Sequence, residues 1–170
     1  MAPRTCGGCT ACYLTHEITE TKKPAGQPCP FCLPNSCEIY QCKPRSCTDF
    51  RCEWLKGIGD GLWRPDRIGV VLDYCTGVLL KQLLQIWEAR PGALANAEVW
   101  EVTGELLECN ICVLHLYLSG KKVIFLPEQL TLSPRERKQL LSEGLEITTF
   151  PILGIPSIKR GGSRLCLETR

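Results

Sequence analysis

The chain has 170 residues, of which 44% are hydrophobic and 22% are charged, a composition typical of globular proteins and unlike that of disordered or fibrous ones. With 20 basic and 18 acidic side chains the net charge is only +2, so the charge balance gives no reason to expect nucleic acid or an anionic membrane as a partner. A chain of this length can bury a substantial core as one fair-sized domain or two small ones.

The N-terminal sequence MAPRTCGGCTAC lacks the apolar segment of a secretory signal, and the chain has no run of about 18 apolar residues that could span a membrane. We therefore expect a cytoplasmic protein with no membrane partner. Thiols in that compartment are mostly kept reduced, so the 13 cysteines are expected to be metal ligands or buried core residues and not a set of disulfides.

Residues 1–55 are rich in cysteine and proline and show no sustained helical or alternating pattern, which predicts loops and short turns. Such a segment buries too little apolar surface to offset its chain entropy, so it needs another source of order. The stretch KGIGDGLWRPDR at 56–67 is predicted to be a linker. The expected fold class is α+β: an irregular, cysteine-rich, metal-bound region at 1–55, followed by a small mixed α/β domain at 68–170.

Five elements are predicted after the linker. IGVVLDY at 68–74 predicts a strand, and residues 78–92 fit either a helix or a second strand, of which we favour the strand. Residues 96 to about 118 have apolar side chains at helical spacing and predict a helix, and KKVIFLP at 121–127 predicts a strand. In SPRERKQLLSEG, Ser133 predicts a helix N-cap with Glu136 three residues later and Gly144 as the stop. The basic tail around Lys159, Arg160 and Arg164 is expected to be a solvated terminus and not a nucleic-acid arm.

The cysteine spacing in the first region points to metal coordination. Two residues between cysteines let a tight turn direct both thiolates at one ion, and three such CxxC pairs occur within residues 6–32. Tetrahedral zinc takes four ligands, so nine thiols could complete two closed sites with one thiol left over. Metal binding would also supply the folding free energy that this region lacks. The predicted ligands are Cys6, Cys9, Cys12, Cys29, Cys32, Cys37, Cys42, Cys47 and Cys52.

Iron or an iron–sulfur cluster is the alternative cofactor. CxxCxxC opens ferredoxin-type cluster motifs, and Cys29-Pro30 is similar to their closing Cys-Pro, although 16 residues separate it from Cys12. His16 could replace one thiolate, but a polar loop histidine is the favoured interpretation. His115 and the thiols outside this region lie in apolar contexts, so we expect them to be packed in the core: Cys75, Cys109, Cys112 and Cys166. For Cys109 and Cys112 a remote pair of metal ligands is the alternative.

The segments CGGCTAC, CPFC and CEIYQCKPRSCTDFRCEW resemble the YkgJ-type cysteine-cluster family, a bacterial group described as zinc- or iron-chelating. The resemblance covers about the first 55 residues, and 64–73 is similar to a subgroup with a small α/β extension. Tyr13 and Lys43 depart from the family pattern, which has cysteine and arginine there, and Cys32 and Cys42 are additional thiols. The positions that match are Cys6, Cys9, Cys12, Cys29, Cys37, Cys47 and Cys52, framed by Ile39, Tyr40, Pro44 and Phe50.

The resemblance implies metal chelation and no particular reaction, and we found no catalytic motif in the sequence. The leading hypothesis is a protein that chelates zinc or iron through its N-terminal cysteines, in a structural or metal-handling role. An iron-dependent redox protein is one alternative. A zinc-stabilised module that binds a protein partner is another, with Trp54, Trp63 and Tyr40 as contact residues, although buried packing of these aromatic side chains is favoured.

Overall fold

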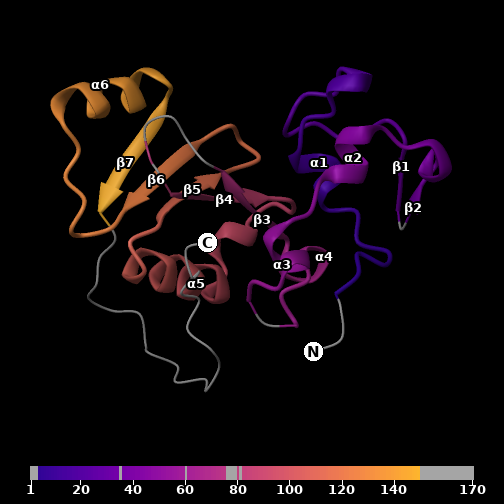
Figure 1. The fold of residues 1–170 in the computed structure, drawn as a ribbon, viewed down its shortest axis with the longest axis horizontal. Helices are drawn as coiled ribbons and strands as arrows, with labels where there is room; N and C mark the ends of the chain where they lie inside the picture. Colours follow the sequence, from indigo (N-terminus) through magenta and orange to yellow (C-terminus); the bar gives the residue numbers. More distant parts are fainter. Residues whose placement is uncertain (1–3, 35, 60, 76–79, 81, 150–170) are drawn as a thin grey trace.

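The computed structural model describes residues 4–34, 36–59, 61–75, 80 and 82–149. It contains a cysteine-rich region of short elements beside a five-stranded mixed sheet with helices (Figure 1). The predicted α+β fold class is therefore confirmed. None of the helices in the described residues is long and apolar enough to cross a membrane.

The cysteine-rich region is built from elements of five residues or fewer in its described part. Its only sheet there is a two-stranded antiparallel hairpin of β1 and β2. Elements this short have little stability of their own, because helix nucleation is costly and an isolated hairpin is marginal. The short elements that precede the main sheet are α1 (Cys12–Thr15), η1 (Thr19–Thr21), β1 (Cys32–Leu33), β2 (Ser36–Cys37), η2 (Tyr40–Cys42), α2 (Arg45–Asp49), α3 (Glu53–Lys56) and, within the predicted linker, α4 (Pro65–Ile68).

The main sheet has the strand order β3-β4-β5-β6-β7. The pairs β3/β4 and β5/β6 are antiparallel, and the pairs β4/β5 and β6/β7 are parallel. Each parallel pair needs a crossover, and each crossover carries a helix. The remaining elements are β3 (Val70–Cys75), β4 (Leu83–Glu88), η3 (Ala93–Ala95), α5 (Ala97–Glu108), β5 (Cys112–Leu116), β6 (Lys122–Leu126), α6 (Pro134–Ser142) and β7 (Leu145–Thr149).

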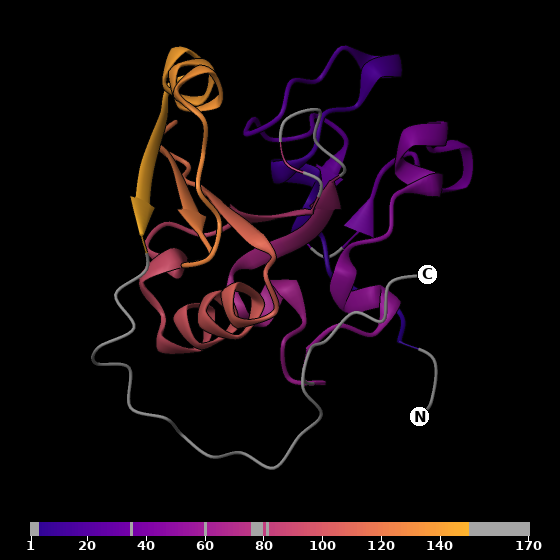
Figure 2. The ribbon, with the colours of Figure 1, turned by 60° about the vertical axis from the view of Figure 1, so that its left-hand side comes forward.

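Helices cover both faces of this sheet, as the turned view in Figure 2 shows. Val102 and Leu106 of α5 pack with Leu84 and Ile86 of β4 in one buried cluster. On the opposite face, Leu140 of α6 packs into a second buried cluster with the strands. The sheet domain therefore has an ample apolar core of its own.

The predicted strands at 68–74 and 121–127 correspond to β3 and β6, and the favoured strand within 78–92 corresponds to β4. The predicted N-cap is also confirmed, since Ser133 and Glu136 form a reciprocal capping box at α6. β7 has no counterpart among the predicted elements. The basic tail and Cys166 lie outside the described residues.

The predicted helix at 96–118 is wrong in its second half. The helix α5 ends at Glu108, and after a turn with Asn110 at φ +60° the chain continues as β5. All five residues of β5 are buried. A strand buried on both faces has no alternating pattern, so its apolar residues extended the apparent helical spacing.

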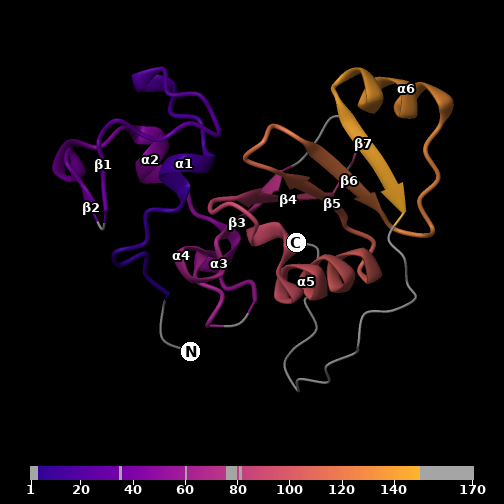
Figure 3. The same ribbon diagram turned by 180° about the vertical axis from the view of Figure 1, so that it is seen from behind.

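The cysteine-rich region packs against one end of the sheet, on the side of β3 (Figures 1 and 3). Cys52 and Trp54, at the start of α3, form a buried cluster with Val71 of β3. Trp87 of β4, which is directly paired with Val71, packs against the same cluster. This contact fixes one wall of the candidate site to the stable sheet.

Candidate metal centre

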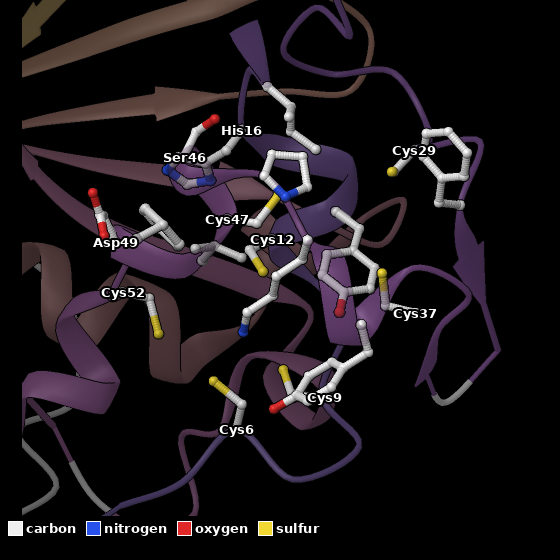
Figure 4. A pocket seen from close by; sticks show the side chains of 18 of the residues that line it. Cys6, Cys9, Cys12, His16, Cys29, Cys37, Ser46, Cys47, Asp49 and Cys52 are labelled. Carbon is white, nitrogen blue, oxygen red and sulfur yellow. The ribbon is translucent and has the colours of Figure 1, made fainter. Parts of the chain in front are cut away.

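A cavity of about 750 Å³ lies within the cysteine-rich region and reaches Val71 of β3. Apolar side chains such as Ile18 and Phe50 form part of its wall. Cys32 and Cys42 are not among its lining residues. The other seven predicted ligands all line it, and Figure 4 shows their side chains: Cys6, Cys9, Cys12, Cys29, Cys37, Cys47 and Cys52.

Two tight turns position four of the predicted ligands. The amide of Cys9 donates a hydrogen bond to the carbonyl of Cys6 at 2.9 Å, and the amide of Cys32 donates to the carbonyl of Cys29 at 3.0 Å. Both turns are of the kind that a two-residue gap between cysteines permits. Each turn is thus closed by one backbone hydrogen bond, but Gly7 has φ +53° in the first turn, whereas proline stands at the corresponding position of the second.

Short elements position the other thiols of the cavity. Cys12 is the first residue of α1, Cys47 lies in α2, and Cys52 is the N-cap residue of α3. Cys37 ends β2 and is paired across the hairpin with Cys32. The thiols thus come from separate segments that the fold brings to one place.

The carboxylate of Glu20 ties η1 to the start of α2. The Ser46 amide donates to Glu20 Oε1 at 3.0 Å, and the Ser46 hydroxyl donates to Glu20 Oε2. These hydrogen bonds lower the pKa of Glu20 to about 2. Since Ser46 precedes Cys47, this connection holds the Cys47 segment against the loop after α1.

Arg4 fixes the start of the described chain to the end of α3. Its Nη1 donates to the carbonyls of Trp54 and Ile58 at 2.8 Å each, and its Nη2 donates to the carbonyl of Gly59 at 2.6 Å. The guanidinium carbon also lies 5.2 Å from the centroid of the Trp54 ring. The first CxxC turn is thereby anchored close to α3 and Cys52.

Burial raises the pKa of several thiols around the cavity. The pKa of Cys12 is raised to about 12, by burial first and then by the charges of the neighbouring cysteines 9, 6, 52 and 47. Burial is also the largest cause of the raised pKa values of Cys9, Cys47 and Cys52. Without a cation these thiols are protonated at neutral pH, and thiolates here need a positive charge beside them.

Backbone amides oppose this effect at two of the sulfurs. Hydrogen bonds from the backbone of Ala11 and Asp66 lower the pKa of Cys9, against the effect of burial. Hydrogen bonds from the backbone of Leu55 and Trp54 act in the same way on Cys52. Such bonds to sulfur favour the thiolate and orient it, as they do at metal-bound cysteines.

Lys23 holds a buried ammonium group within electrostatic reach of three of the thiols. Its side chain is 4% exposed, and Nζ donates hydrogen bonds to the carbonyl of Leu14 at 3.0 Å and to the carbonyl of His16. Burial lowers the pKa of Lys23, while the charges of Cys29, Cys12 and Cys47 oppose that decrease.

A second cation, Arg64, pairs with Asp66 through two hydrogen bonds of 2.7 and 2.6 Å. Its pKa is raised, by Asp66 first and also by the charges of cysteines 9 and 6.

His16 lines the cavity, but both of its ring nitrogens have protein partners. Nδ1 lies 2.8 Å from the hydroxyl oxygen of Thr15, and Nε2 lies 3.2 Å from Oδ2 of Asp73 in β3. Its ring centroid is 3.8 Å from that of Phe50. These contacts make His16 a link between α1 and the sheet and leave coordination to the thiols.

The other described cysteines lie in the sheet domain, in packed surroundings. Cys112 is buried in β5, where burial raises its pKa to about 11. Cys75 accepts a long hydrogen bond of 3.6 Å from Gln85 Nε2, and Cys109 packs against the core. All described cysteines are free thiols. In the described residues, no group of three or more His, Cys, Asp or Glu side chains is already arranged to hold a metal ion.

The three aromatic residues considered as partner contacts differ in exposure. Trp54 is 6% exposed and Trp63 is partly buried against the core, whereas Tyr40 is 59% exposed. Lys43 Nζ lies 4.6 Å from the centroid of the Tyr40 ring. Packing accounts for both tryptophans.

Sequence signals for the polar residues around the cavity are weak. Lys23 stands in the common sequence TKKP, and nothing in its local pattern distinguishes it from the exposed Lys22. Glu20 and Asp73 are similarly isolated in the sequence and meet their partners only through the fold.

The chain matches no protein-family model, no curated protein and no solved structure. The residues around the cavity are therefore what indicates its function.

Proposed function

We propose that this protein binds zinc through the cysteines of its N-terminal region, in a structural or metal-handling role. The observation that carries the proposal is the convergence of seven predicted ligands, from separate short segments, on one cavity. Thiolates are soft ligands and select zinc, copper(I) and iron–sulfur clusters over harder cations. The donor set therefore fits zinc.

The energetics of the region support the same proposal. Its short elements have little core of their own, and a structural zinc ion can supply the missing folding free energy. The buried thiols are costly to ionise without a cation, and a divalent ion bound among them would offset that cost. The positive charges of Lys23 and Arg64 also favour the thiolate form of the neighbouring cysteines.

Two further parts of the proposal follow from the sequence. A thiol-only site requires a reducing compartment, and we place the protein in the cytoplasm on that ground. We also propose membership of the YkgJ-type cysteine-cluster family, on the spacing and framing residues of the first 55 positions.

Metal analysis of purified protein tests the proposal. Protein prepared both aerobically and anaerobically is expected to carry at least about one zinc ion per chain, because structural zinc survives purification. The measurement is elemental analysis by mass spectrometry together with protein quantification. Less than about one transition-metal ion per chain in both preparations would contradict metal binding.

An iron–sulfur cluster is the second candidate, and the backbone hydrogen bonds to the sulfurs of Cys9 and Cys52 favour it. Hydrogen bonds to sulfur are one of the means by which proteins tune cluster potentials. Anaerobically purified protein would then show a visible absorption band that changes on reduction. A colourless protein replete with zinc would exclude this candidate.

Replacing Lys23 with methionine is expected to weaken metal binding about 10–100-fold, as the loss of outer contacts to metal ligands does elsewhere. The variant keeps most of the buried aliphatic chain but removes the ammonium beside cysteines 12, 29 and 47. Competition with a chromophoric zinc chelator measures the affinity. Lys22→Met is the matched control, because Lys22 is adjacent and exposed. Equal affinities in the two variants would show that the Lys23 charge has no role.

A further inference from the structure

We propose that the thiols form two separate four-cysteine metal sites, one built on each CxxC turn, and that Cys42 belongs to neither. This inference rests on the proposed metal-binding function and specifies its ligands. The first site comprises Cys6, Cys9, Cys12 and Cys52. The second site comprises Cys29, Cys32, Cys37 and Cys47.

The first site brings the turn at residues 6–9 together with the starts of two helices. Cys12 begins α1 only three residues after Cys9, and Cys52 is the N-cap of α3. Arg4 anchors the chain just before Cys6 to the end of that same helix α3. In Figure 4 Cys6 and Cys9 lie at one end of the cavity, Cys52 lies to one side, and Cys12 lies in the middle.

The electrostatic neighbours of these thiols agree with this grouping. The charges of four cysteines raise the pKa of Cys12, and three of these cysteines belong to the first site. The pKa of Cys52 is raised by the charges of cysteines 6 and 9. Arg64 lies beside the same two thiols. The backbone hydrogen bonds to sulfur also occur here, at Cys9 and Cys52.

The second site is built on the hairpin. Cys32 ends the second CxxC turn and begins β1, and it is directly paired with Cys37 of β2. Residues paired in an antiparallel ladder have Cα atoms about 4.5–5.5 Å apart, which suits two ligands of one ion. Cys32 lies outside the cavity lining, and its thiol forms hydrogen bonds with the carbonyl of Leu33, at 3.4 Å, and with the side chain of Thr10. A side-chain rotation would free it to join its neighbours.

Cys47 completes the second site from α2. Among the cysteines whose charges raise the pKa of Cys47, Cys29 and Cys37 have the largest effect, and the same two raise the pKa of Cys32. Glu20 holds the start of α2 in place through Ser46. The charge of Lys43 lowers the pKa of Cys47, so each site has a basic side chain of its own. The charges of thiols from both sites act on the pKa of Lys23.

Cys42 differs from all eight proposed ligands. It is exposed at the end of η2 and also does not line the cavity, a combination that none of the eight shares. Eight thiolates in two tetrahedral sets complete the coordination of two zinc ions. One zinc ion and four thiolates have a net charge of −2, which the neighbouring basic side chains partly offset. Binding releases the thiol protons to solvent, and no redox step is involved.

Native mass spectrometry of the full chain, purified from zinc-supplemented medium, tests this division. We expect two zinc ions in the wild type and in Cys42→Ser, and one in both Cys52→Ser and Cys47→Ser. Loss of both ions in either of the last two variants, loss of an ion in Cys42→Ser, or a single ion in the wild type would overturn the division. A wild type without metal would instead overturn the proposed function.

A second measurement on the wild type covers the case in which a variant does not fold. During stepwise removal of zinc by a chelator, thiols are alkylated and located by peptide mapping. We expect Cys42 to react before chelation, and the other eight to become reactive in two sets that match the two sites. Exposure of all eight together, or in sets that mix the two CxxC turns, would overturn the division.

Discussion

Exhaustive chelation is expected to unfold residues 4–49 while the five-stranded sheet stays folded. The short helices and the two-residue hairpin strands of this part bury little apolar surface, so without metal nothing offsets its chain entropy. The sheet has buried clusters on both faces that involve none of the nine predicted ligands. The two parts of the chain therefore depend on different sources of stability.

Hydrogen exchange measured by mass spectrometry separates the two responses. Amides in the CxxC turns and in α2, such as those of Cys32 and Thr48, should lose their protection after chelation, and amides of β5 should keep theirs. Restoring zinc to the same sample serves as the control and should restore protection. Unchanged exchange in residues 4–49, once elemental analysis shows that the metal is gone, would contradict a structural role for metal.

The cysteines of the candidate site could be predicted from the sequence, whereas the polar residues around them could not. Cysteine spacing is a local signal, because a two-residue gap constrains the turn wherever the chain later folds. Seven of the nine predicted ligands do line one cavity. The contacts of Lys23 with the carbonyls of Leu14 and His16, and of Asp73 with His16, depend on tertiary structure and have no comparable local pattern.

The same distinction explains which elements of the sheet domain were predicted. The capping box at Ser133 is a local interaction, and α6 begins where it was expected. The strand β5 lies between β4 and β6 with both faces buried, so its sequence carries no alternation to distinguish it from helix. The order of strands depends on crossovers that no local pattern specifies.

Acidification from pH 7 to about pH 4 is expected to lower the free energy of unfolding by about 3 kcal/mol through His115 alone. This side chain of β5 is fully buried, and its ring centroid lies 4.7 Å from that of Phe125. Because the hydroxyl of Thr103 donates to the carbonyl of Val99, it accepts the proton of His115 Nε2 at 2.9 Å. Nδ1 therefore carries the lone pair, and it has no hydrogen-bond partner among the described residues.

Burial lowers the pKa of His115 from 6.5 to about 4. The folded-state pKa lies below that of the unfolded state, so the unfolded chain takes up a proton first as the pH falls. The stabilising contribution is complete above about pH 6.5 and is lost progressively toward pH 4, and this difference in pKa corresponds to the expected 3 kcal/mol.

Urea unfolding of the wild type and of His115→Phe at several pH values measures this contribution. Phenylalanine keeps an aromatic ring beside Phe125 and Trp100 but cannot titrate, so the variant should lose less stability on acidification than the wild type does. Acid release of metal affects both proteins and cancels in the difference between them. Thr103→Val is the control for the lost hydrogen bond, because it keeps the titrating ring and should retain the pH dependence. Parallel pH profiles for the wild type and His115→Phe would show that the imidazole does not titrate differently in the folded and unfolded states.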